Sequence, residues 1–149
     1  MELEGTHGLA VCDTDPFKLH YISCEWRSGL CPDSEWRTAV DMNRRAFDEH
    51  RWGLADAVVF LAPDESVVRQ QRMSDQGRRR RRFEKHLRFR PWLVESYQAF
   101  DYVDSGRVLW KAPHEPLPGS VREPRTGLEL FDAFMSALAN VTDTAPSAR

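Results

Sequence analysis

The sequence lacks three features that would each assign it to a class of protein. No apolar run approaches the roughly 20 residues that span a bilayer. The acidic start, Met1-Glu2-Leu3-Glu4, has neither the basic residues nor the apolar stretch of a signal peptide. The cysteines form no Cys-x-x-Cys pair, which argues against a zinc site, and their odd number argues against a disulfide framework. We therefore expect a cytoplasmic protein with reduced thiols and no membrane segment.

The composition is that of a globular protein with a core of its own. The chain has 149 residues, of which 41% are hydrophobic and 30% are charged. This length suggests one domain, which we place at residues 1–141. The polar end, residues 142–149, is expected to be a disordered tail.

Apolar runs alternate with stretches of helical period along the chain. Such alternation implies βαβ crossovers and a parallel sheet, so the predicted fold class is α/β, with a parallel three-layer sheet flanked by helices. Three strands make a thin sheet, which leaves room for a missing neighbouring strand or for a homo-oligomer. Strands are expected at 8–12, 56–62 and 107–112. A helix or irregular segment is expected at 17–29. Helices are expected from 33 or 34 to Gly53, from 64 or 66 to about 100 with a short break at 74–77 and a division or kink at Pro91, and from about 128 to 138.

Positive charge is concentrated in one segment, residues 69–90. This segment holds ten arginines and lysines against Asp75 and Glu84, a net charge of +8, in a chain whose net charge is −2. The rest of the chain therefore carries −10. A protein that binds nucleic acid generally spreads its basic charge over a whole face, so this distribution favours a local anionic ligand.

Five consecutive arginines, residues 78–82, cannot all face one ligand. Successive helical residues turn by about 100°, so Arg78 and Arg82 share a face with Arg81 near it, whereas Arg79 and Arg80 point elsewhere. The remaining arginines would be solvated or paired with acids such as Glu84. Guanidinium groups suit phosphate oxygens because they stay charged and donate in pairs. Two or three of these arginines are therefore expected to meet one phosphate.

Two carboxylates, Asp13 and Asp15, follow the first predicted strand. Ligands gather at the carboxyl ends of strands in open parallel sheets. Such carboxylates can hold Mg²⁺ or accept a proton from a hydroxyl nucleophile. The alternative for Asp13 is a solvated loop carboxylate. Asp15 precedes a proline, and for this residue we favour the role of a helix cap.

Polar and aromatic side chains follow this acidic turn. By their position, Lys18, Tyr21 and Arg27 can line the pocket of an acceptor substrate. For Tyr21 we favour the alternative, a half-buried aromatic that packs the fold.

Two passages resemble P-loop kinases that act on nucleosides, nucleotides or other small molecules. The passage LAPDESVVRQQRMSDQGRRRRRFEKH resembles their arginine-rich lid, and VCDTDP resembles the acidic strand end beside the acceptor hydroxyl and Mg²⁺. The resemblance implies a P-loop kinase-like sheet, ATP and Mg²⁺ as cofactors, and a transferase activity. It implies a catalytic and metal-binding Asp13, and phosphate-binding lid arginines at Arg72, Arg78 and Arg82. Asp15 is a second candidate catalytic carboxylate by its position after the first predicted strand.

The defining phosphate loop of those kinases, Gly-x-x-x-x-Gly-Lys-Ser/Thr, is absent from the sequence. Only seven residues precede Gly8, too few for the strand, loop and helix that carry it. We therefore expect the first βα unit to be missing, and no ATP-dependent kinase activity from this chain alone. The predicted function is an incomplete or inactive kinase-like domain that binds a nucleotide or small phosphorylated ligand. The alternatives are a nucleic-acid-binding module that uses the arginine-rich helix and a non-catalytic interaction protein.

Overall fold

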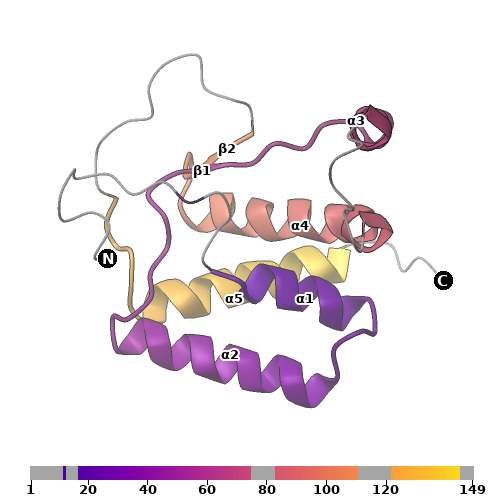
Figure 1. Ribbon diagram of the computed structural model, residues 1–149. Coiled ribbons are helices and arrows are strands. Elements are labelled where there is room, and N and C mark those ends of the chain that lie inside the picture. Colours follow the sequence, from indigo (N-terminus) through magenta and orange to yellow (C-terminus); the bar gives the residue numbers. More distant parts are fainter. Residues whose placement is uncertain (1–11, 13–16, 75–82, 111–121, 145–149) are drawn as a thin grey trace.

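The computed structural model describes residues 12, 17–74, 83–110 and 122–144 (Figure 1). These residues form five helices and two very short strands. In chain order they are α1 (Leu19–Arg27), α2 (Asp33–Asp48), β1 (Val58–Val59), α3 (Glu65–Ser74), α4 (Phe83–Val103), β2 (Val108–Leu109) and α5 (Leu128–Thr144). Each helix in these ranges is too short or too polar to span a bilayer.

Four of the helices enclose the core. Helix α4 packs on α5, α1 packs on α2 and α4, and α2 packs on α5 (Figure 1). Phe17 lies at the centre, with its ring centroid 5.5 Å from those of Phe47 and Phe134 and 5.9 Å from that of Phe100. Because Phe17 precedes α1, this aromatic cluster holds the start of the described chain against α2, α4 and α5.

Helix α2 begins where the sequence predicts and ends earlier. Pro32 is extended, and Asp33 and Glu35 place negative charge in the first turn, where the helix dipole favours it. The expected stop was Gly53, but α2 ends at Asp48 because His50 takes a left-handed φ of 53°. Gly53 instead allows a close approach to the segment before α5. A Cβ atom there would lie 2.8 Å from the carbonyl oxygen of Arg125.

The expected three-layer parallel sheet is wrong, because the described residues are mainly helical. Strands β1 and β2 form a two-stranded parallel sheet, with Val58 opposite Val108 and Val59 opposite Leu109. Among the described residues of the strands predicted at 56–62 and 107–112, two in each form a strand, and the strand expected at 8–12 lies outside the described residues except for Cys12. The physical reason is that the helices bury their aromatic side chains chiefly against one another, so that little of the core needs a sheet.

A network of ion pairs joins the starts of both strands to the segment before α5. The side chain of Arg107 has no exposed surface and donates to the carboxylate of Asp104 and to the carbonyl oxygens of Ala55, at 2.9 Å, and Pro124, at 3.3 Å. Arg122 Nη1 donates to the other oxygen of Asp104 at 2.9 Å. Buried charges are stable only when they are paired in this way.

A second carboxylate, Asp56, extends the network. It accepts from Arg125 Nε at 2.7 Å and from the backbone N–H of Arg122 at 2.8 Å. Burial alone would raise the pKa of Asp56, but these hydrogen bonds outweigh it and lower the pKa below its ordinary value.

The stability of the fold is expected to depend on pH through His20 of α1. Burial lowers the pKa of His20 from 6.5 to about 4, and the nearby Lys18 charge acts in the same direction. An unfolded chain therefore binds a proton that the folded chain rejects between these values. The free energy of unfolding is therefore unaffected by this histidine above pH 6.5 and falls as the pH decreases toward 4. Protonation of His20 can lower it by about 3 kcal/mol at most.

Urea denaturation between pH 4.5 and 7.5 checks this expectation. His20→Gln removes the titrating group, so the free energy of unfolding should fall less steeply with acid in this variant than in the wild type. His86→Gln is the control, because His86 is exposed. Equal slopes in the wild type and His20→Gln would contradict the prediction.

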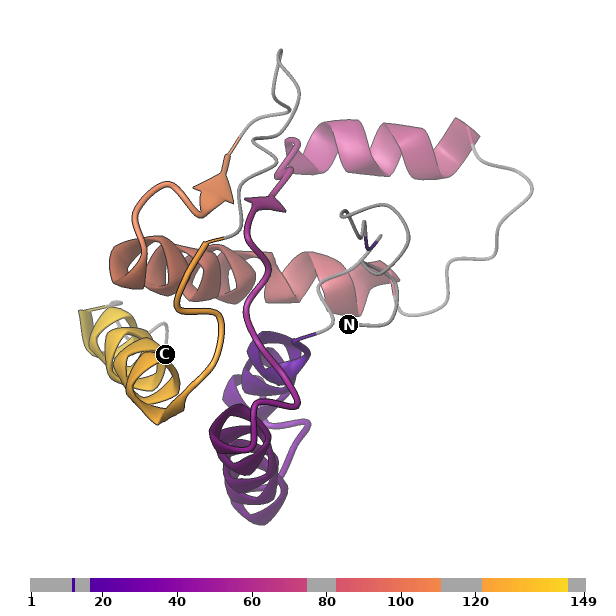
Figure 2. The same ribbon diagram turned by 90° about the vertical axis from the view of Figure 1, so that its left-hand side faces the viewer.

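Helix α3 stands apart from the four packed helices. None of its residues is buried, and it lies beside the first turns of α4 on the side away from α2 (Figures 1 and 2). Pro91 lies within α4, which continues through it to Val103, so the helix is not divided there. The sequence predicts a short break at 74–77, and α3 ends at Ser74; the segment before α4, 75–82, lies outside the described residues.

Candidate anion-binding site at the ends of α3 and α4

The structure describes half of the site residues predicted from the sequence. Arg72 lies in the last turn of α3, Tyr21 and Arg27 lie on α1, and Lys18 is exposed just before α1. The other predicted site residues, Asp13, Asp15, Arg78 and Arg82, lie outside the described residues.

Tyr21 and Arg27 both lie in the contact between α1 and α4. The hydroxyl group of Tyr21 is 3.3 Å from His86 Nδ1, and its ring packs edge-on against Phe89. Arg27 donates to Glu95 at 2.5 Å. The two side chains lie six positions apart on α1, and each has a partner on α4. Their predicted role in binding an acceptor stays a prediction.

Arg72 takes part in a group of charged side chains that joins α3 to α4. Two arginines of α3 converge on one carboxylate of α4. Arg69 donates in parallel to both oxygens of Glu84, at 2.9 and 3.0 Å, and Arg72 donates to one of them at 3.2 Å. Arg69 Nε also donates to Glu65, four residues earlier on its own helix, at 2.7 Å. The Glu84 carboxylate therefore lies between two guanidinium groups.

The ring of Phe83 supports both arginines. Phe83 is buried at the start of α4, and the guanidinium carbon of Arg72 lies 4.3 Å from its centroid. The corresponding distance for Arg69 is 5.9 Å. A cation over an aromatic ring is attracted by the negative face of the ring. Phe83 therefore positions the arginines independently of Glu84.

A third arginine, Arg88, lies about one turn further along α4. It is four residues after Glu84 and therefore on the same face of α4. It is exposed and has no hydrogen bond or ion pair within the part of the chain that the structure describes. We call Arg69, Arg72 and Arg88 with Glu84 the arginine cluster. Arg69 and Arg72 share Glu84, Arg69 also pairs with Glu65, and Arg88 adds a positive charge on the same face of α4 as Glu84.

The ion pairs of the cluster are accessible to solvent. The side chains of Arg69 and Arg72 are each 45% exposed and that of Glu84 is 58% exposed. Hydrogen bonds from Arg69 hold the pKa of Glu84 below its ordinary value, so the carboxylate is charged at neutral pH. Exposed ion pairs contribute little to stability because water competes for both partners. The Glu84 carboxylate can therefore be replaced by another anion at small cost.

Sequence reasoning identified part of this cluster. It assigned Arg72 to phosphate and named Glu84 as a partner for the arginines, but it gave Arg69 no role. One signal for Arg69 was available, because Glu65 and Arg69 have the i, i+4 spacing of a helical ion pair. The pairing of Arg69 with Glu84 spans fifteen positions and has no local signal.

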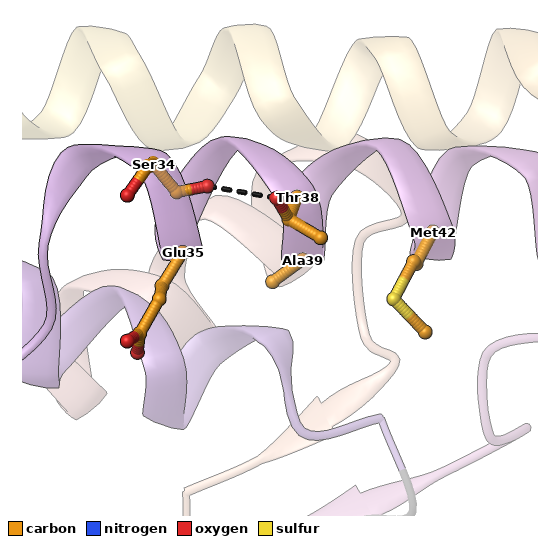
Figure 3. A pocket seen from close by; sticks show the side chains of 5 residues that line it. All are labelled: Ser34, Glu35, Thr38, Ala39 and Met42. Carbon is orange, nitrogen blue, oxygen red and sulfur yellow. Dashed lines mark hydrogen bonds between the residues drawn. The ribbon is translucent and has the colours of Figure 1, made fainter.

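Other polar features of the described residues differ from this arrangement. Within the described ranges, no three His, Cys, Asp or Glu side chains lie close enough to hold a metal ion. Cys24 is buried, and burial raises the pKa of its thiol to about 12, so this thiol stays protonated. A shallow pocket runs along α2, away from α3, and Met42 and Ala39 lie beside its polar residues (Figure 3). It contains no basic side chain among its lining residues Ser34, Glu35, Thr38, Ala39 and Met42.

Comparisons with protein-family models, with curated proteins and with solved structures each found no match.

Proposed function

We propose that this protein binds the phosphate group of a nucleotide or small phosphorylated ligand at the arginine cluster, and that it does not transfer phosphate by itself. One observation carries the proposal. Two guanidinium groups converge on the Glu84 carboxylate, and a carboxylate presents a pair of oxygens much as a phosphate does. The geometry that holds Glu84 is thus a geometry that suits a phosphate.

The charge distribution supports the same proposal. The segment 69–90 carries +8 in a chain of net charge −2. Such a local field attracts anions and raises their rate of encounter. The five arginines of 78–82 are part of this charge. In the cytoplasm, where we expect the protein, phosphorylated ligands are available to it.

The resemblance of two short passages to P-loop kinases supports a nucleotide as the ligand. ATP and Mg²⁺ would be the cofactors of such an activity, and phosphotransfer would need a phosphate loop that this sequence lacks. The resemblance rests on these passages and not on the fold. We therefore propose binding as the function of this chain, with a kinase reaction only where another chain or segment supplies the loop.

Replacing both arginines of α3 tests the proposal. The double variant Arg69→Ala/Arg72→Ala is expected to weaken the binding of ATP by at least about tenfold, because each charge-assisted hydrogen bond contributes about 1.5–3 kcal/mol. Isothermal titration calorimetry with ATP and with adenosine monophosphate measures the effect. Circular dichroism of each variant checks that the helices remain.

A matched control separates the cluster from total charge. Arg44→Ala/Arg51→Ala also removes two exposed arginines that pair with acids, Asp132 and Glu49. It changes the net charge by the same amount at another place and should leave ATP binding within about twofold. An equal loss in both double variants would contradict a specific site, and no binding to the wild type would contradict the proposal itself.

Nucleic acid is the second candidate ligand, and the concentration of charge in 69–90 is the observation that favours it. Binding of a single-stranded oligonucleotide would then fall with salt at a logarithmic slope of about −0.7 per neutralised phosphate. Titration of the wild type in increasing salt measures this slope. A steep slope together with no affinity for mononucleotides would favour this candidate over the first.

A further inference from the structure

We propose that the exposed face of α2 is a self-association surface, on which a second copy of this chain packs with its own α2 antiparallel to the first. The inference goes beyond the proposed function, because α2 and α3 lie on opposite sides of α4 (Figures 1 and 2). A symmetric dimer of this kind uses the same patch on both copies. The patch must therefore complement itself in shape and in charge.

The shape of this face combines a protruding side chain with a shallow pocket. Met42 is 67% exposed and lies at one end of the pocket, whose other lining residues are Ser34, Glu35, Thr38 and Ala39 (Figure 3). The residues 35, 38, 39 and 42 have the spacing of four neighbours on one helical face, and four such residues form the hole that receives one side chain of a facing helix. The Thr38 hydroxyl donates to the Ser34 carbonyl oxygen at 2.8 Å, so covering this hole leaves that donor satisfied.

An antiparallel second copy places the methionine over the hole. With the two-fold axis level with Val40, Thr38 faces Met42 of the second copy, because each lies two residues from Val40. By the same symmetry, Met42 of the first copy lies over the hole of the second. Glu35 and Arg45 each lie five residues from Val40, so they also come face to face. One register therefore fills both holes and brings opposite charges together.

The charges of this face are available for such a contact. Glu35 and Arg45 are both exposed, and neither has an ion pair within the described part of the chain. Arg44, the neighbour of Arg45, already pairs with Asp132 of α5. Two-fold symmetry forms the pair between Glu35 and Arg45 twice. A parallel arrangement would instead place like charges opposite each other, so the charges select the antiparallel one.

Exposed apolar side chains extend the patch toward both ends of α2. Trp52 is 44% exposed and lines a second pocket together with Thr38 and Met42. Leu30, three residues before α2, is 57% exposed. An antiparallel partner brings the start of one α2 beside the end of the other, so Leu30 of each copy comes level with the segment that carries Trp52 of the other. Removal of this apolar surface from water would drive the association.

Charge reversal at the two facing positions tests the proposal. The wild type is expected to dimerise with a micromolar dissociation constant, because a contact centred on one helix is small for a protein interface. Glu35→Arg and Arg45→Glu should each raise this constant by at least about tenfold, since each replaces two attractions by two repulsions. Sedimentation velocity over a range of concentrations measures it. Met42→Glu puts a charge into the hole and should have the same effect.

A mixture of the two charge variants makes the test specific to the pairing. Glu35→Arg is positive at both positions and Arg45→Glu is negative at both. An equimolar mixture should therefore form a heterodimer with a dissociation constant within about threefold of the wild-type value. Arg37→Glu is the control, because it changes the net charge as Arg45→Glu does but lies about 140° from Met42 around α2. It should leave the dissociation constant within about threefold. Circular dichroism checks that each variant keeps its helices.

Each outcome decides for or against this surface. Dimerisation of the wild type, its loss in both charge variants and its recovery in their mixture would support the antiparallel contact. A wild type that stays monomeric from about 1 to 300 μM would overturn the proposal. So would a dimer that both reversals leave intact, a mixture that does not recover, or an equal loss in Arg37→Glu. None of these measurements uses ATP, so failure of the dimer leaves the proposed function untouched.

Discussion

Arg107→Ala is expected to lower the free energy of unfolding by about 3–5 kcal/mol, because breaking a buried ion pair leaves its partners uncompensated. The side chain of Arg107 is completely buried and donates to Asp104 and to the carbonyl oxygens of Ala55 and Pro124. Alanine removes all of these donors. The loss should also loosen the pairing of β1 with β2, because Val58 N–H donates to the Arg107 carbonyl oxygen.

Urea denaturation followed by circular dichroism measures this change. Arg44→Ala is the control, because the pair between Arg44 and Asp132 is exposed and should contribute no more than about 1 kcal/mol. A similar loss in both variants would contradict the structural role of Arg107. Arg107→Met then separates the contribution of packing from that of the hydrogen bonds, because methionine keeps much of the volume of the side chain but none of its donors.

Phe134→Ala is expected to destabilise the fold by a similar amount, about 3–5 kcal/mol, because it leaves a cavity in the core. Phe134 of α5 is 1% exposed. Its ring centroid lies 4.7 Å from that of Phe100 on α4 and 5.5 Å from that of Phe17. The substitution therefore removes contacts that join α5, α4 and the segment before α1.

The matched control for this variant is Tyr102→Ala on α4. Tyr102 is 83% exposed, so removal of its ring should change the free energy of unfolding by no more than about 0.5 kcal/mol. Thermal and urea denaturation of both variants give the comparison. A loss below about 1 kcal/mol for Phe134→Ala would show that the aromatic cluster is not closely packed.

The helices could largely be predicted from local features. The possible caps Asp33 and Ser34 and the apolar residues Trp36, Val40 and Phe47 placed that helix to within a turn at either end, although Pro32 holds the cap position. The periodic residues Leu128, Phe131 and Phe134 placed the start of α5, which continues beyond the expected end at Leu138 to Thr144. These signals are reliable because a helix is stabilised by residues three or four positions apart, which the sequence displays directly.

The sheet could not be predicted in the same way. The run from Ala57 to Ala62 is apolar, and such a run shows that a segment prefers burial. It does not show what will cover the segment. In the fold, Phe60 of this run packs against Tyr97 of α4, with 4.6 Å between the ring centroids, and only two residues pair with β2. An apolar segment covered by a helix and one covered by strands have the same composition.

The sequence by itself determined where the positive charge lies, which segments are helical, and that Arg72 belongs to the basic segment. Only the tertiary structure decided that Arg69 and Arg72 share the carboxylate of Glu84, at separations of fifteen and twelve positions. The reason is physical. Such a pair forms only when two helices meet, and α3 meets α4 where the buried ring of Phe83 lies under the arginines. Opposite charges attract wherever they lie, but the packing of α3 on α4 decides that these arginines meet Glu84.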